Sequence, residues 1–299
     1  MALAQQRRRR QIFQKNIMPW LFIAPILLLH LVVVIGPSLA AFYYSLTDWS
    51  GFGPAEYVGL ENFRELLADT NYRAAIQHNA SWLAFFLTVP FLMALVAAAL
   101  LAQIKKGSMA FRSIMFIPYI LPSVIIVSIW RNLLSPRLGI GAQAAKWGIE
   151  GFDRAFLGET GTALLTIAFI DNWHFWGFLM VLFLAAMQNI SPELYDAAKI
   201  DGANRRQEFW HITVPGILPT LAFMLLMTGI WSFLVFDYVW LLTQGGPAGA
   251  SEVMATYLYK QAFSRFEAGY ASAIGLSMSL FAGVIISVFI FLRRRGLEI

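Results

Sequence analysis

Long apolar stretches separated by short polar segments dominate the pattern of this sequence. A helix needs about 20 mostly apolar residues to cross a bilayer, and none of the stretches alternates as the strands of a membrane barrel do. Because an unpaired strand would leave its backbone groups unsatisfied in lipid, the pattern predicts spanning helices. Six spans are expected, at residues 18–46, 79–103, 109–134, 162–189, 217–243 and 270–292. The expected fold is all-α: a polytopic membrane protein with a bundle of about six transmembrane helices.

Composition rules out the two soluble domains that a length of 299 residues would otherwise allow. Hydrophobic residues make up 59% of the chain and charged residues only 13%, whereas soluble proteins average roughly 45–50% and 25%. So few charges could not cover the surface of a soluble protein. We therefore expect one six-span domain at residues 17–292, between a basic N-terminal tail at 1–16 and a basic C-terminal tail at 293–299.

The distribution of charge predicts the orientation of the spans. Segments on the side of the termini carry 14 Lys and Arg residues and 5 acidic residues. The opposite side carries 8 basic and 10 acidic residues, besides Asp171 and Asp237 within the spans. Positively charged loops stay in the cytoplasm, so both termini are expected there. Topology thus explains the net charge of +5, and no nucleic-acid partner is expected. The run Arg7–Arg10 is expected to anchor this topology and to contact anionic membrane lipid.

The first span has an alternative interpretation as a cleaved secretory signal. Four arginines and an apolar run precede the small-residue triplet Ser38-Leu39-Ala40. The apolar core of a signal has about 7–15 residues, and the run here is closer to the about 20 residues of a span. A retained span is therefore favoured.

Two loops opposite the termini are longer than a simple connection requires. Residues Leu60–Leu67 in the 47–78 loop have the spacing of a short amphipathic helix, and the 134–161 loop holds a second, weaker amphipathic stretch. Loops of this length are often functional. The alternative is an interfacial helix that packs against lipid headgroups.

The residue inventory excludes several kinds of catalytic site. Without cysteine there can be no disulfide, thiol nucleophile or thiolate metal site. The four histidines lack metal-binding spacing, and no P-loop motif is present to hold ATP phosphates. We expect no catalytic residue, no metal site and no cofactor bound by this chain, which is therefore not expected to be an enzyme.

The most informative polar segment, residues 191–215, lies between the fourth and fifth spans. Ser191 and Pro192 have the chemistry of a helix N-cap and first position, and Glu193 adds a negative charge to the first turn. Gly202 can adopt the left-handed conformation that ends a helix. A second short helix is expected at Ala203–Ile212.

The first of these helices presents a small, shallow apolar surface flanked by charge. Leu194, Ala197 and Ala198 share one helical face, and Pro215 and Pro219 are expected to open the fifth span. A short helix–turn–helix of this kind suits docking into the groove of a partner. The alternative is a connecting loop that packs on its own bundle.

The same segment resembles the coupling loop of permease subunits of binding-protein-dependent ABC importers. That family shows E-A-A, three residues, G, nine residues and I-x-L-P. The corresponding residues here are Asp196-Ala197-Ala198, Gly202 and Ile212-Thr213-Val214-Pro215, with Asp for Glu at 196 and Val for Leu at 214. The segment Leu194–Ala203 is similar to the carbohydrate-uptake branch, which includes maltose, multiple-sugar and glycerol-3-phosphate permeases. Further similar stretches are Gly59–Phe63, Ile117–Pro122, Phe236–Pro247 and Gly269–Ala271.

This resemblance implies an assembly and a set of roles. The partners would be a second homologous permease forming a heterodimer, two cytoplasmic ABC ATPases carrying ATP and Mg, and an extracytoplasmic solute-binding protein. The location would be the bacterial or archaeal cytoplasmic (inner) membrane. The loop at 190–216 would hold a cytoplasmic coupling helix between spans four and five. Ala197 and Ala198 would dock, Gly202 would form the turn, and Ile212 and Pro215 would complete the pattern. Edge charges to the ATPase groove would come from Glu193, Asp196 and Asp201.

Candidates for the solute path are ionisable and aromatic residues within the spans, where a charge costs about 2.5–3.5 kcal/mol on insertion scales. They are Asp171, Asn172, Trp173, His174 and Trp176 in span four, and Asp237 and Tyr238 in span five. Carboxylates, amides and aromatic faces are suited to sugars, and the spacing of Asp171, His174 and Phe178 places them on one helical face.

Each of these candidates has an ordinary structural alternative. Asp237 lies close to the outer end of its span and could be an interfacial cap, and Trp and Tyr also gather at membrane interfaces. The partner permease could hold the solute alone. His30 is expected to be an interior histidine. Arg131 and Arg265 could contact a binding protein or form a solvated face.

Two other classes of function were weighed. An ion-driven secondary transporter or channel is the main alternative, but the chain shows no inverted repeat and no matching pair of broken helices. A membrane-embedded enzyme would need clustered carboxylates or histidines at membrane depth, and only isolated ones occur.

Overall fold

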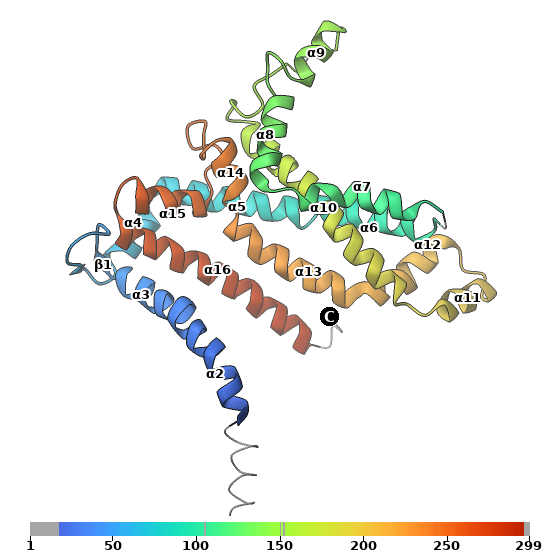
Figure 1. Cartoon of the computed structure of the whole chain (residues 1–299), viewed down its shortest axis with the longest axis horizontal. Coiled ribbons are helices and arrows are strands. Elements are labelled where there is room, and N and C mark those ends of the chain that lie inside the picture. The colour runs from blue at the N-terminus through green and yellow to red at the C-terminus, as the bar shows by residue number, and fades with distance from the viewer. Residues whose placement is uncertain (1–17, 105, 150, 152, 296–299) are drawn as a thin grey trace, which may run out of the picture. The chain divides into compact units, whose positions relative to one another are not determined.

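The computed structural model describes residues 18–104, 106–149, 151 and 153–295 (Figure 1). Arg7–Arg10 and most of the two tails lie outside the described residues. Helices dominate, which confirms the predicted all-α class. Five helices in the described part of the chain are long and apolar enough to cross a membrane, or six if one sharply bent pair forms a single span.

The helices follow one another with few long interruptions. In chain order they are α2 (Met18–His30), the π-helical η2 (Leu31–Ile35), α3 (Gly36–Tyr44), α4 (Glu61–Ala68), α5 (Thr70–Phe86), α6 (Val89–Ala102), α7 (Ser108–Ile120), α8 (Ser123–Leu133), α9 (Ile140–Lys146), α10 (Ala163–Gln188), α11 (Pro192–Ile200), α12 (Arg205–Glu208), the π-helical η3 (Phe209–Thr213), α13 (Val214–Leu234), α14 (Asp237–Leu242), α15 (Met254–Phe263) and α16 (Ala268–Arg294). The strands β1 (Thr47–Asp48) and β2 (Glu56–Tyr57) form a small antiparallel hairpin.

Three spans differ from their expected form. The second begins at Thr70 rather than 79, because Asp69 caps the helix by accepting a hydrogen bond from the Asn71 backbone N–H at 2.8 Å. The third is not one helix, since α7 and α8 meet at 99°. Pro122 has no N–H and forces Leu121 into an extended conformation, which ends α7.

The short helix expected at Ala203–Ile212 is present as α12 and η3, but it is not separate from the fifth span. Instead α12 and η3 run without interruption into α13, so the fifth span begins with residues that seemed to belong to the loop. Pro215 falls in the first turn of α13, directly after the π-helical turn η3, and without an N–H it cannot donate a hydrogen bond to that preceding turn. If α12 and η3 are counted with the fifth span, the loop that remains after α10 consists of one helix, α11, and a short turn.

The chain divides into two compact units, each described by itself. Unit 1 comprises the described residues up to Glu65 together with Gln261–Leu276. In unit 1 the Asn62 amide donates to the carbonyl oxygens of Ser45 and Thr47, both at 2.9 Å. Gly269 donates its N–H to the Trp49 carbonyl at 2.9 Å. Asn62 and Gly269 thus bind the backbone of residues 45–49, which is a structural role for the Gly59–Phe63 and Gly269–Ala271 stretches.

Within unit 1 the first span is little buried. No residue of α2 is buried, and His30, expected to be an interior histidine, is exposed. The expected amphipathic helix Leu60–Leu67 is present as α4, but Leu66 is buried while Leu67 is 76% exposed.

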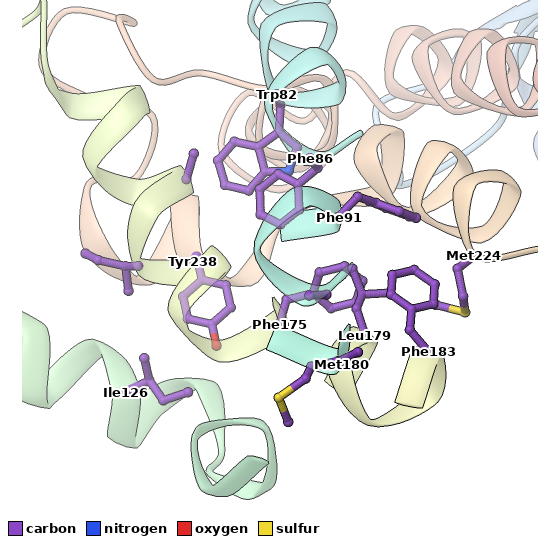
Figure 2. Close-up of a cluster of buried hydrophobic side chains, with 14 of the residues drawn as sticks. Trp82, Phe86, Phe91, Ile126, Phe175, Leu179, Met180, Phe183, Met224 and Tyr238 are labelled. Carbon is purple, nitrogen blue, oxygen red and sulfur yellow. The ribbon is translucent and has the colours of Figure 1, made fainter. Parts of the chain in front are cut away.

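Unit 2 comprises Leu66–Lys260 and the residues from Ser277 onward, and it is organised around α10. Twelve of the 26 residues of α10 are buried. Phe175, Leu179, Met180 and Phe183 project from this helix into the hydrophobic core, as Figure 2 shows. Gly177 lets α7 approach closely, because a Cβ there would lie 2.0 Å from the Met115 carbonyl oxygen.

Replacing Gly177 tests this close approach. Gly177→Ala should destabilise the protein by about 1–3 kcal/mol or more, the usual cost of overpacking, because α7 would have to move away from α10. The measurement is the thermal unfolding midpoint of the detergent-solubilised protein. Gly283→Ala in α16 is the matched control, since nothing lies within 4 Å of its added Cβ. Equal midpoints for the two variants would contradict the packing described.

Candidate functional site

A cavity of about 410 Å³ opens within unit 2, among helices that are far apart in the sequence. This volume lies in the range of about 300–1,000 Å³ typical of small-molecule sites. Side chains from α5, α7, α10, α13 and α14 form its walls, together with the two residues that join α13 to α14. The lining residues are Trp82, Phe86, Tyr119, Asp171, His174, Phe175, Thr228, Trp231, Ser232, Leu234, Val235, Phe236, Asp237 and Tyr238.

Four of the expected solute-path residues come together in this cavity. Asp171 and His174 lie one turn apart on α10, with Asp171 Oδ1 3.7 Å from His174 Nδ1. Asp237 and Tyr238 enter from the start of α14. The Asp237 carboxylate has no hydrogen-bonding or charged partner among the described residues. The cavity therefore holds one carboxylate beside an imidazole and one that is available to a ligand.

The remaining three candidates point away from the cavity. Asn172 is 2% exposed and donates to the Met93 Sδ at 3.4 Å. Trp173 packs edge-to-face on Trp130, with ring centroids 5.7 Å apart, and Trp176 packs against the hydrophobic core. Successive side chains on a helix point about 100° apart, so consecutive residues cannot all face one cavity.

Most of the aromatic wall was not anticipated from the sequence. Trp82 and Phe86 stack one turn apart on α5, with centroids 5.1 Å apart. Phe175 contacts both Phe86 and Trp231, at centroid distances of 6.0 and 6.1 Å. The spacing of Trp82 and Phe86 was a detectable signal of a shared helical face. Their meeting with Trp231, about 150 residues later, has no local signal.

The cavity wall also contains polar atoms without protein partners. The Tyr238 hydroxyl and Thr228 Oγ1 are both buried and accept or donate no hydrogen bond within the described protein. Ser232 differs, because its hydroxyl donates to the Thr228 carbonyl at 2.8 Å. Buried polar groups normally have partners. Two lining residues of the cavity therefore carry buried hydroxyls that have no partner among the described residues.

The 191–215 loop has its predicted helix and turn. The helix is α11, and Gly202 follows it with φ of +82°, the left-handed conformation expected of a helix end. The Ala203 N–H donates to the Ala198 carbonyl at 2.9 Å, which closes this cap. Ser191 makes no capping hydrogen bond with its side chain. Asn204 and Gln207 form a capping box at the start of α12, a signal that the sequence contained.

The candidate docking residues lie on the surface of this loop. Glu193, Leu194, Ala197 and Asp201 are exposed, and Ala198 is half-buried. Asp196 accepts a hydrogen bond from Lys199 at 3.0 Å, and this hydrogen bond raises the pKa of the Lys199 ammonium.

A groove of about 270 Å³ runs beside the helix end and has Asp201, Gly202 and Ile212 in its wall. Pro215 is exposed on α13, outside the groove. These geometries describe a charged, shallow surface, and the docking roles remain predictions.

Known proteins resemble this chain over most of its length. The sequence pattern of the family described as binding-protein-dependent transport system inner membrane component matches residues 91–296. A probable ABC transporter permease protein, YurN of Bacillus subtilis, is 36% identical over 265 residues, covering 87% of this chain and 90% of YurN. The diacetylchitobiose uptake system permease protein NgcF of Streptomyces coelicolor is 32% identical over 286 residues, covering 91% of this chain and 81% of NgcF.

Structural similarity agrees with these matches. A permease chain in the crystal structure of a bacterial ABC transporter involved in the import of alginate has a TM-score of 0.86. The match covers 97% of this chain and 100% of that chain at 23% sequence identity. This likeness shows that the two chains share a fold.

Two tyrosine variants test whether the cavity hydroxyl is free. Tyr238→Phe removes a hydroxyl without a partner, so the free energy of unfolding should stay within about 0.5 kcal/mol or rise. Tyr257→Phe removes a phenol that donates to Asp69 Oδ2, and a hydrogen bond to a charged group contributes about 1.5–3 kcal/mol. Thermal unfolding compares the two variants. A loss of stability for Tyr238→Phe as large as that for Tyr257→Phe would show that its hydroxyl has a partner.

Proposed function

The chain belongs to the family of inner membrane components of binding-protein-dependent transport systems, and from this premise we propose that it is the permease subunit of an ATP-driven importer for a sugar or related polyol. It is a transport subunit rather than an enzyme. The observation that carries the solute assignment is the cavity, which places aromatic side chains beside the Asp237 carboxylate. Sugars present apolar ring faces and hydroxyl groups to such a site. The name of the similar protein NgcF, a diacetylchitobiose permease, agrees with this class.

The charge of the cavity narrows the class of solute. Its lining includes Asp171 and Asp237 and no Lys or Arg. A carboxylated or phosphorylated sugar would lose water there without gaining a Lys or Arg partner, so an acidic sugar would be disfavoured. The proposed solute is therefore an uncharged sugar or one that carries an amine.

In the proposed assembly both termini and the 191–215 loop are cytoplasmic. The loop docks on one of two ABC ATPases, which hold ATP and Mg, and a second permease completes the translocation path. An extracytoplasmic binding protein delivers the solute. Support for docking comes from the exposed Leu194 and Ala197 beside the unpaired carboxylates of Glu193 and Asp201. ATP-driven closure of the ATPases would shift the bundle from an inward-open to an outward-open state, because ATP binds the two states with different affinity.

Co-purification in mild detergent from the native membrane tests the assembly. We expect to recover a second permease and an ATPase, with ATPase activity stimulated by the binding protein carrying its solute. Mass spectrometry of that solute should identify an uncharged or amine-bearing sugar. An acidic sugar would contradict the charge argument alone. Recovery of this chain without any ATPase would contradict the importer and favour the ion-driven transporter.

The turn at Gly202 provides a variant that separates docking from folding. Gly202→Asp should insert normally, because nothing lies within 4 Å of an added Cβ and Asp tolerates positive φ about as well as Asn. It should abolish binding-protein-stimulated ATPase activity by placing a further negative charge at the docking surface. Gly202→Asn is the control, since Asn tolerates positive φ and adds no charge. Both variants are assayed in the co-purified importer. Full stimulation in Gly202→Asp would contradict the docking role.

A further inference from the structure

Two side-chain hydrogen bonds connect the loop after α10 to the rest of the bundle. The Tyr195 hydroxyl on α11 lies 2.9 Å from Thr213 Oγ1 at the end of η3. Arg205 on α12 donates to Gln103 Oε1, at the end of α6, at 3.0 Å. No residue of α11 is buried, and a cavity of about 640 Å³ lies beside it. The position of α11 therefore depends on a few specific contacts rather than on close packing.

The Tyr195–Thr213 contact joins an exposed helix to a buried site. Thr213 is only 7% exposed, whereas Tyr195 is half-buried at the edge of the cavity. Thr213 Oγ1 also donates to the Glu208 carbonyl in a longer contact of 3.5 Å. Because a threonine hydroxyl has one proton, the Tyr195 phenol then donates to Thr213 Oγ1. The result is a chain of hydrogen bonds from Tyr195 on α11, through Thr213, to the Glu208 carbonyl at the end of α12.

Thr213 occupies the end of a π-helical turn, a form that is frequently found at functional sites. From this turn α13 continues without interruption to Leu234. The distance from Thr213 to Thr228 along the helix is about 22 Å, at a rise of about 1.5 Å per residue. Thr228, Trp231 and Leu234 belong to the wall of the solute cavity. One continuous helix, with Pro219 inside it, thus begins at the Tyr195 contact and ends at the cavity.

We infer that Tyr195 and Thr213 are positioning residues that transmit movement of α11 to the cavity through α13. This inference rests on the proposed function, in which α11 docks on the ATPase. When the ATPases pull α11, the hydrogen bond moves the π turn and α13 with it. Without the bond, α11 moves on its flexible connections and the cavity end of α13 remains in place.

The test uses the complete importer with its partner permease, ATPases and binding protein. The sequence contains no cysteine, so Leu234→Cys introduces a single thiol into this chain. Leu234 is 53% exposed in the cavity wall. The rate at which a membrane-impermeant maleimide labels this cysteine is measured with and without Mg·ATP and vanadate. The subunits are separated by electrophoresis so that only the label on this chain is counted. In the Leu234→Cys importer, the nucleotide should change that rate.

Adding Thr213→Val or Tyr195→Phe should reduce this nucleotide response roughly two- to tenfold, the effect of losing one hydrogen bond. Thr213→Ser keeps the hydroxyl and should keep the response. Combining Thr213→Val with Tyr195→Phe should cause no further loss, because both remove the same interaction. Basal ATPase activity checks that the ATPases are present in each variant.

Each outcome decides the inference. An unchanged response in Thr213→Val, or an equal loss in Thr213→Ser, would overturn it, the latter by assigning the effect to packing. If Thr213→Val fails to assemble, Tyr195→Phe gives the decision, because its phenol is half-buried beside a cavity. If the importer has ATPase activity but the substitutions at Tyr195 and Thr213 do not change the nucleotide response, the proposed function remains intact and only this inference fails. Absence of both ATPase activity and any nucleotide response in Leu234→Cys would overturn the proposed function and this inference together.

Discussion

The structure depends on the need of every backbone N–H and C=O group in a bilayer to find a partner within the protein. Helices meet this need internally, which is why they form most of the described chain. Irregular backbone at membrane depth is tolerated only where protein or a cavity surrounds it. Val235 and Phe236 separate α13 from α14, and both line the cavity of about 410 Å³. The interruption of the fifth span and the cavity are therefore one feature.

The sequence could predict the helical spans because their apolar runs have the length that a bilayer imposes. It also predicted α11 and the Gly202 turn, because caps and turns are determined by a few adjacent residues. The 99° bend between α7 and α8 was missed although Pro122 marks it. The residues on both sides of Pro122 are apolar, so hydropathy predicts one continuous span. Hydropathy does not take account of the missing N–H of proline, which ends the helix. The continuity of η3 and α13 was missed because a proline was given too much weight rather than too little. Pro215 was taken to begin a new helix, whereas the helix continues through it.

The cavity was predictable only in part. Asp171 and His174 share a helical face, and ionisable residues within spans are rare enough to be noticed individually. Nearby Asn172, Trp173 and Trp176 seemed equivalent in sequence, but helical geometry turns them toward other helices. Trp82 and Trp231 come from different spans, and their meeting depends on how α5, α10 and α13 pack. Such contacts between distant segments are a property of tertiary packing rather than of local pattern.

The first span shows how unevenly this chain specifies its own structure. No residue of α2 is buried within its unit, whereas twelve residues of α10 are buried in unit 2. Exchanging one apolar side chain for another in α2 therefore disturbs no buried contact of unit 1, while the same exchange in α10 disturbs the core of unit 2. In the proposed assembly, substitutions in α2 would be constrained by lipid and by neighbouring subunits, and substitutions in α10 by the packing of the subunit itself. A survey of the substitutions that each position tolerates would thus distinguish residues that stabilise the fold of this subunit from residues that contact lipid or other subunits.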